Sequence, residues 1–521
     1  MFISDLVNLQ LVLLFVFCNL SPFYLAVASP PKHIASLPGF DGVPPFHLET
    51  GYVSVDEENG AELFYYFVES EGNPGQDPVL LWLTGGDRCS VLSALAFEIG
   101  PFKFVEEPYN GGVPRLMYNP YSWTKVASIL FVDWPVGAGF SFSRNPIGYD
   151  VGLGDVPATL QLKKFLYKWF IEHPDYLANP FYIGADSYAG KIAPFLAEKI
   201  SEGVFLLYSP FRLISDFYGF PGLLLLGSVA DALFQISKLD SGPNLNYRSY
   251  HESLDTNPCN PVTGELFDNN SRVPFAHGFG IISDQFYETI TRHCQGEDYT
   301  HPKKAFCVEA LDAFNYVVDN EISKPHVLYP KCSYASPKSN NGTAYRNILM
   351  EETEPLYNPP PRPAINCMVY KNYLSYFWAN SDVTRDALGI KKGTVKEWVR
   401  CHTSGLPSTK HDIKSSIDYH RNVTMKGYRS LVYSGDHDIV VPFLGTQTWV
   451  RLLNFTRVDD WRAWHVDGQS AGFTISYSNN MTFTTIKVTT HLCLGGGHTA
   501  PEYQPERCFA MIQRWISDKP L

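Results

Sequence analysis

A serine at a sharp corner between a buried strand and a helix limits most strongly how this chain can fold. The apolar segment Phe181–Gly184 is predicted as a strand, and small residues, among them Ala185 and Ala189, surround Ser187. Such a turn needs small side chains because the strand and helix backbones approach closely and push the serine oxygen outward. The strict form of the motif has Gly where this chain has Ala185. Taken alone, the segment is therefore also compatible with a purely structural turn.

Segments of strand length alternate with helical patterns over the first two hundred residues. Val79–Leu83 and Ser128–Val132 are short apolar runs that end at turns and are predicted as buried strands. Between Asp155 and His173 the apolar residues follow a helical spacing, with Asp155 expected as the N-cap, and Lys191–Ile200 is also predicted to be helical. This alternation predicts an α/β fold with a mostly parallel central sheet and helices on both faces.

The rest of the chain divides into a middle part and a C-terminal part. Residues 300–420 are rich in Pro, Asn and Tyr, and the segment at about 265–420 is predicted to form a cap over the sheet rather than further sheet. Strand patterns return at 430–434, 471–477 and 481–488. No internal repeat is present, and we predict a single domain over residues 29–521.

The charge balance restricts the partners. Lys and Arg number 41 against 53 Asp and Glu, which gives a net charge of −12. A nucleic-acid-binding protein needs a basic face to neutralise phosphates, so this class is not expected. We expect a small partner, and the sequence does not define an oligomeric state.

The N-terminus is typical of a secretory signal peptide. The segment 6–20 is largely apolar, and Ala26-Val27-Ala28 supplies the small residues of a cleavage site, so residues 1–28 are predicted to be removed. An uncleaved anchor is the alternative, but the segment is shorter than the roughly 20 residues of a membrane span. No stable membrane span is therefore expected.

The cysteines and glycosylation sequons also fit the secretory pathway. Cys18 leaves with the signal, and none of the remaining cysteines is spaced as C-x-x-C, so neither a metal nor another cofactor is expected. Disulfides are expected instead, with their pairing open and at least one thiol left over because the remaining number is odd. Five N-x-S/T sequons are candidate glycosylation sites: Asn269, Asn341, Asn422, Asn454 and Asn480.

Two further segments supply partners for Ser187. Asp436 and Asp438 follow a predicted strand, and His498 follows three glycines near the C-terminus. The order Ser, Asp, His is that of α/β-hydrolases, in which the His takes the proton of the Ser and the Asp fixes the His tautomer. We assign Asp438 to this role because it directly precedes a Val-Pro turn, and Asp436 to loop capping. His437 has no evident partner and is interpreted as a solvated loop residue.

Several long motifs can be recognised together in this chain: Leu81–Gly86, Pro135–Ser141, the turn at Ser187, Arg272–Gly278 and His498–Tyr503. Together they resemble those of plant serine carboxypeptidase-like proteins, in the branch that includes acyltransferases using glucose esters. The resemblance runs from about residue 36 to 203 and from about 262 to the C-terminus.

The resemblance implies a catalytic triad of Ser187, Asp438 and His498. It also implies an oxyanion hole formed by the backbone N–H groups of Gly86 and Tyr188. The expected fold is that of an α/β-hydrolase with an inserted cap.

The resemblance also implies where the substrate binds. In family peptidases an Asn before the Gly-Gly pair, a Glu before the Ser and a further Glu bind the terminal carboxylate of the substrate. The matching residues here are Thr84, which precedes Gly85, then Asp186 and Glu98. Thr and Asp are shorter, so carboxylate binding should be weaker, and both exchanges resemble the acyltransferase branch.

The function implied is acyl transfer from a glucose ester to an alcohol acceptor in secondary metabolism, in the vacuole or outside the cell. A serine carboxypeptidase acting on a peptide C-terminus is the alternative, and a catalytically impaired binding protein is a third hypothesis. The third rests on departures from the family pattern. The family motif Gly-Gly-Pro-Gly-Cys is Gly85–Cys89 here without the Pro and the third Gly, and residues 204–259 and 488–494 have no family counterpart. We interpret both segments as retained non-coding sequence.

Overall fold

In this computed structural model the described residues are 30–86, 88–145, 154–206, 255–259, 261–332, 362–402, 411–487 and 496–521. The predicted signal peptide at 1–28 lies outside these residues. So do the segment 488–494, most of the segment 204–259, and Asn341.

One large mixed sheet forms the centre of the fold, with the strand order β1-β2-β3-β7-β4-β9-β10-β11-β14-β13-β12 and β8 paired to β3. The strands from β7 to β14 run parallel, as the alternation of strands and helices predicts, whereas both flanks are antiparallel. The strands are β1 (Lys32–His33), β2 (Leu48–Asp56), β3 (Ala61–Val68), β4 (Val79–Leu83), β7 (Ser128–Val132), β8 (Phe142–Ser143), β9 (Phe181–Asp186), β10 (Asp255–Cys259), β11 (Ser430–Gly435), β12 (Arg462–Val466), β13 (Gln469–Tyr477) and β14 (Met481–Ile486). A separate hairpin pairs β5 (Phe102–Phe104) with β6 (Leu116–Tyr118).

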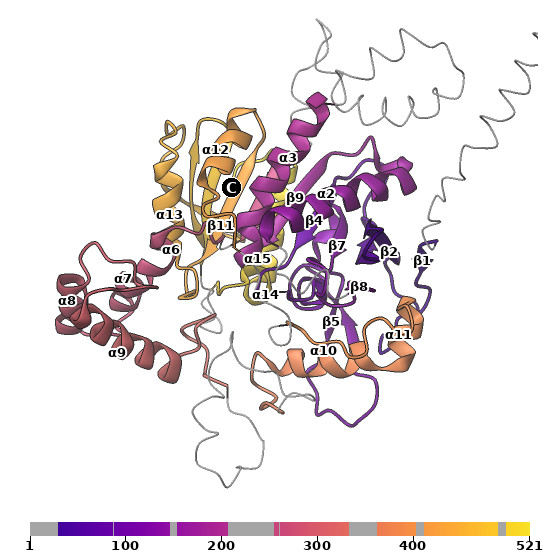
Figure 1. Ribbon diagram of the computed structural model, residues 1–521, viewed down its shortest axis with the longest axis horizontal. Helices are drawn as coiled ribbons and strands as arrows, with labels where there is room; N and C mark the ends of the chain where they lie inside the picture. The colour runs from indigo at the N-terminus through magenta and orange to yellow at the C-terminus, as the bar shows by residue number, and fades with distance from the viewer. Residues whose placement is uncertain are drawn as a thin grey trace, which may run out of the picture.

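Helices cover both faces of this sheet (Figure 1). On one face α2 (Asp155–Glu172), α3 (Ile192–Leu206) and α12 (Ile417–Met425) pack on alternate residues of the central strands. On the other face lie the π-helix η1 (Ala94–Glu98), α14 (Ala500–Tyr503) and α15 (Pro505–Ile516). Helix α13 (Phe443–Leu452) packs against β11 and β14. Of the strands between these layers, β4 (VLLWL) and β7 (SILFV) are almost entirely apolar because both of their faces are buried.

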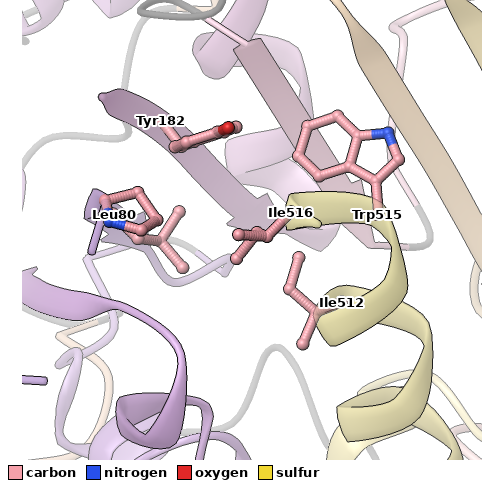
Figure 2. Close-up of a pocket in the computed structure, with 6 residues that line it drawn as sticks. Leu80, Tyr182, Ile512, Trp515 and Ile516 are labelled. Carbon is pink, nitrogen blue, oxygen red and sulfur yellow. The ribbon is translucent and has the colours of Figure 1, made fainter. Parts of the chain in front are cut away.

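The contact between α15 and the sheet includes a small apolar pocket. Figure 2 shows Leu80 and Tyr182, from β4 and β9, facing Ile512, Trp515 and Ile516 of α15. The rings of Tyr182 and Trp515 are 5.5 Å apart. Leu80 and Tyr182 stand near the amino ends of their strands, so this pocket is part of the packing layer.

Between residues 265 and 420 the regular elements of the described chain are helices. The helices are α6 (Leu266–Asn270), α7 (Arg272–Gly278), α8 (Asp284–His293), α9 (Ala305–Glu321), α10 (Tyr370–Asn380) and α11 (Asp382–Leu388). Helices α7 to α9 gather at one side of the molecule, and α10 and α11 at another (Figure 1). A disulfide between Cys294 and Cys307 joins the end of α8 to α9.

Two details differ from the sequence predictions. The N-cap of α2 is Gly154, and Asp155 is the first helical residue, with its buried side chain bonded to other segments instead of to the helix end. In addition, Asp255–Cys259 form β10, which pairs with both β9 and β11. The last part of the segment 204–259, for which no place in the fold was expected, is therefore a central strand.

Candidate active site

The predicted site residues lie just beyond the carboxyl ends of neighbouring strands. Thr84–Gly86 follow β4, Ser187 follows β9, Asp438 follows β11, and His498 comes after β14. Since these four strands are parallel to one another, their carboxyl ends meet at one edge of the sheet, where α/β proteins bind ligands.

Ser187 occupies the corner between β9 and the short helix η5 (Ser187–Lys191). Its φ is +50°, a left-handed conformation that costs a residue with a side chain roughly 1–2 kcal/mol. A hydrogen bond of 3.0 Å from the Val262 N–H to the Ser187 carbonyl helps to hold the turn. Such strain at a strand-to-helix turn is what presents a nucleophilic oxygen at the top of the sheet.

The structure brings Ser187, His498 and Asp438 together. His498 Nε2 lies 2.8 Å from Ser187 Oγ, and His498 Nδ1 lies 2.8 Å from Asp438 Oδ2. Asp438 is fully buried and also accepts hydrogen bonds from the backbone N–H groups of Val440 and Val441, at 2.7 and 3.1 Å. With Nδ1 donating to the carboxylate, Nε2 can accept the Ser187 proton.

Two short segments carry the acid and the base of this arrangement. We call His437–Ile439 the acid loop and Gly496–Thr499 the base loop. The His437 N–H donates to the Gly496 carbonyl at 2.9 Å, so the two loops are directly bonded.

The interpretation of His437 as a solvated residue was wrong. Its side chain is 10% exposed, its Nδ1 bonds to Asp436, and its ring contacts those of Phe279 and His326. Phe279 and His326 come from the distant segment that contains α7 to α9. No local pattern in the sequence indicates either contact.

The predicted oxyanion loop lies directly against the Ser187 turn. A Cβ placed on Gly85 would lie 2.5 Å from Ser187 Cβ and 3.0 Å from the Tyr188 backbone nitrogen, so only glycine fits there. Gly86 is exposed and has a φ of +78°, which also favours glycine. The backbone of Gly85 therefore lies directly against Ser187 and Tyr188, and Gly86, predicted with Tyr188 as an oxyanion donor, is the next residue.

The departure from the family motif leaves Arg88 in a left-handed conformation, with a φ of +51°. A neighbouring segment bonds to the main chain on both sides of Cys89. The Ser90 N–H donates to the Arg400 carbonyl at 2.7 Å, and the His402 N–H donates to the Arg88 carbonyl at 3.2 Å. The disulfide between Cys89 and Cys401 joins the same two segments. The loop is thus fixed without the family's Pro and third Gly.

Two of the residues predicted to bind substrate, Asp186 and Glu98, are buried carboxylic acids. Asp186 Oδ1 accepts the Gly85 N–H at 3.0 Å. Burial raises the pKa of Asp186 to about 6, although the nearby His498 and the bond from Gly85 lower it. Burial, with the negative charges of Asp186 and Glu502, raises the pKa of Glu98 well above its ordinary value. A raised pKa favours the protonated form of Glu98, which can donate a hydrogen bond.

Among the described residues, Thr84 Oγ1 and Glu98 Oε2 are buried without a hydrogen-bond partner. Buried polar atoms are normally bonded, so both atoms are available to a ligand.

An ion pair connects α10 to the helix that follows the base loop. Lys371 Nζ contacts the Glu502 carboxylate, which also accepts the Thr499 hydroxyl. For Glu502, burial raises the pKa, but Lys371 and Thr499 outweigh this effect and keep the pKa below its ordinary value.

Four of the five predicted sequon residues are described, and all four are exposed: Asn269, Asn422, Asn454 and Asn480. Two of their side-chain amides are bonded, Asn422 to Glu198 at 2.7 Å and Asn480 to the Gly427 carbonyl at 3.0 Å. A glycan on either of these would have to replace that bond, whereas Asn269 and Asn454 show no such obstacle. Glycosylation at all five remains a prediction.

The fold and the arrangement at the carboxyl edge of the sheet are those of the α/β-hydrolase class. Among solved structures, the chain is similar to the prohormone-processing carboxypeptidase KEX1(delta)p from Saccharomyces cerevisiae, with a TM-score of 0.61 and 16% identity. The match covers 91% of this chain and 92% of that chain. At this level of identity the match shows only that the two chains share a fold.

The chain belongs to the serine carboxypeptidase family, whose sequence profile matches residues 38–207 and 258–518. Serine carboxypeptidase-like 17 of Arabidopsis thaliana is 41% identical over 94% of this chain and 93% of its own length. Serine carboxypeptidase-like 19 of the same organism is 40% identical over 99% of this chain and 100% of its own length. Residues 208–257, which the profile does not match, lie within the segment 204–259.

Family membership and the disulfides together fit the secretory pathway. The described residues contain three disulfides, Cys89–Cys401, Cys294–Cys307 and Cys332–Cys367, and a buried free thiol at Cys508. Within the described residues, no helix has the length and apolar character needed to cross a membrane. Membership in this family also implies a small substrate.

Proposed function

We propose that the protein is an acyltransferase that moves an acyl group from a glucose ester to an alcohol acceptor in the vacuole or outside the cell. Ser187 Oγ attacks the ester carbonyl while His498 takes its proton, and the sugar oxygen leaves with that proton. His498 then takes a proton from the alcohol, whose oxygen attacks the acyl-enzyme and releases Ser187. The oxyanion formed in each step is stabilised by the N–H groups of Gly86 and Tyr188.

The observation that carries the proposal is the arrangement of Thr84 and Asp186, which stand where the family peptidases have Asn and Glu. Asp186 directs one carboxylate oxygen at the Gly85 N–H, and Thr84 presents only a short hydroxyl. The terminal carboxylate of a peptide would be left short of donors here, and a buried unpaired charge is costly. A sugar ester brings no such charge, and its hydroxyls can bond to Thr84 Oγ1 and Glu98 Oε2, which are buried without a partner among the described residues.

The test is a reaction of the secreted protein with a phenolic glucose ester and an alcohol. We expect a new ester and an equal amount of free glucose, and Ser187→Ala should form neither. If wild-type protein releases only the free acid and glucose, it is a hydrolase and the proposal is wrong.

The alternative, a serine carboxypeptidase, is favoured by Glu98, the one residue of the peptidase carboxylate site that this chain keeps. A peptidase should release the C-terminal amino acid from an N-blocked dipeptide between about pH 4 and about pH 7. No release over that range excludes this activity. The variant Thr84→Asn with Asp186→Glu rebuilds the peptidase residues, and a gain of release in it alone would support the acyltransferase assignment.

Labelling of Ser187 with a fluorophosphonate tests the third hypothesis, an impaired binding protein. This reagent reacts only with a serine that its histidine activates. Rapid labelling of wild-type protein and none of Ser187→Ala would exclude the impaired protein.

A further inference from the structure

Four residues that follow helix α9 lie against the acid loop. We call Lys324–Val327 the strap. The Ile439 N–H donates to the Lys324 carbonyl at 3.2 Å, and the Val327 N–H donates to the His437 carbonyl at 3.0 Å. The strap therefore bonds to both ends of the acid loop, on either side of its catalytic carboxylate.

The strap also holds the base loop. The His498 N–H donates to the Pro325 carbonyl at 2.7 Å. A Cβ placed on Gly497 would lie 2.6 Å from the same carbonyl oxygen, so the contact is tight. A loop with neighbouring glycines such as Gly496 and Gly497 has many accessible conformations, and it needs an external contact to hold its histidine in one place.

His326 is the central side chain of the strap and is fully buried. Its Nδ1 accepts the Leu328 N–H at 3.3 Å. Its ring lies 5.4 Å from that of His437 in the acid loop and 5.0 Å from that of Tyr503, which follows the base loop. The ring thus fills the space between the two segments that must stay in register for Asp438 to meet His498.

We propose that the strap sets the geometry of the triad and that His326 is its positioning residue. Through α9, the strap also connects the triad to the cap helices, since Lys324 pairs with Asp319 of α9 at 3.3 Å. The proposal rests on the proposed function only in requiring that Ser187 be the nucleophile. It applies equally to a transferase and a hydrolase.

The experiment compares His326→Ala with His326→Phe by the rate of fluorophosphonate labelling and by kcat and KM on a small ester. A displacement of about 1 Å in a catalytic group can cost about a hundredfold in rate. We expect labelling and kcat of His326→Ala to fall between about tenfold and about a hundredfold with KM unchanged. His326→Phe, which keeps the ring contacts, should recover most of the rate.

His420→Ala is the matched control. His420 is also buried, 1% exposed, and stacks at 4.6 Å on Trp449 of α13. It should lose stability as His326→Ala does, yet label at the wild-type rate. Melting temperatures of all variants identify the temperature at which each is folded.

Labelling of folded His326→Ala at the wild-type rate would overturn the strap proposal and leave the proposed function intact. Equal losses of rate in His326→Ala and His420→Ala would also overturn it, because the effect would then be general. If wild-type protein is not labelled at all, both the proposed function and the strap proposal fail.

Discussion

Asp438 accepts hydrogen bonds from His498 and from the backbone N–H groups of Val440 and Val441. Asp438→Asn keeps the size of the side chain but removes its charge and lets the amide favour the wrong His498 tautomer. We expect the rate of fluorophosphonate labelling to fall by about 10³–10⁴ with little change in the melting temperature. Asp436→Asn is the control, because Asp436 bonds to His437 and not to His498. A similar loss of labelling rate in both variants would show that the acid role has been assigned incorrectly to Asp438.

A second buried carboxylate, Asp155, stands behind the residue that follows Ser187. It accepts hydrogen bonds from the Tyr188 hydroxyl and the Ile413 N–H, and Lys191 Nζ lies 3.6 Å away. The side chains of Asp155 and Lys191 are 1% and 5% exposed. Lys191→Met would leave this carboxylate buried without a cation, and we expect a loss of about 3 kcal/mol in the free energy of unfolding, measured with urea.

The double variant Lys191→Met with Asp155→Asn should recover part of this loss, because the buried charge is gone. If Lys191→Met unfolds at the same urea concentration as the wild type, the ion pair of Asp155 and Lys191 does not contribute to the free energy of unfolding.

At the scale of single residues, the sequence predicts what local patterns encode. Ser187, Asp438 and His498 are each marked by their own turn, and the structure brings all three together. Asp155 was misassigned as a helix N-cap because its partners, Tyr188 and Ile413, are distant in sequence. The same reason hides contacts such as that of His326 with the acid loop.

Helix α2 is joined to β2 at its end by a buried ion pair, which predicts a pH-dependent stability. His173 Nε2 lies 2.8 Å from Glu49 Oε1, while its Nδ1 lies 2.8 Å from the Trp169 carbonyl. Burial alone would lower the pKa of His173 and raise that of Glu49. Their mutual bond, with that from Tyr65 to Glu49, outweighs burial, so the pKa of His173 is raised and that of Glu49 is lowered.

A histidine pKa raised by folding stabilises the fold fully below its unfolded value of about 6.5, and this stability is lost as the pH rises through the folded value. A glutamate pKa lowered by folding stabilises the fold fully above its unfolded value of about 4.5, and this stability is lost as the pH falls through the folded value. The pair should therefore contribute most between about pH 4.5 and 6.5. The melting temperature of His173→Gln should depend less on pH above this window than that of wild type. Parallel curves would contradict the assignment.

The disulfide Cys89–Cys401 fixes the predicted oxyanion loop to a segment 312 residues away in sequence. Replacing both cysteines by Ser should cost about 2–4 kcal/mol of stability. It should also slow the labelling of Ser187, since the loop that carries Gly86 loses a restraint. The matched control replaces Cys294 and Cys307, which join α8 to α9, and should leave labelling unchanged in folded protein. Equal labelling rates in the two double variants would show that the Cys89–Cys401 disulfide does not influence the reactivity of Ser187.

At the scale of elements, long periodic segments are predicted well. The helix expected over Asp155–His173 is observed as Asp155–Glu172, and the strand expected over Ser430–Ser434 as Ser430–Gly435. Strand β10 was not predicted because its sequence, Asp255–Cys259, includes Asp, Asn and Pro and has no apolar alternation. It pairs with β9 and β11 on either side, so its place comes from the sheet and not from its own residues.

For the whole molecule, the alternation of strands and helices predicts the parallel centre of the sheet but not its antiparallel flanks. The pairing of β2 with β3 and of β12 with β13 depends on which strands become neighbours, and a periodic pattern does not contain that information. The matched family profile extends to both flanks and leaves residues 208–257 unmatched.

This unmatched segment leads to a prediction about the whole chain. Helix α3 ends at Leu206 and β10 begins at Asp255, and the strands on both sides of this crossover, β9 and β10, are parallel neighbours. Deleting residues 208–251 leaves Leu207 and residues 252–254 as the connection, within the roughly 2–6 residues usual between a helix and the next strand. We expect the shortened protein to be secreted, to melt at or above the wild-type temperature, and to label at Ser187. A shortened chain that is not secreted, while wild type is, would show that the segment is needed for folding.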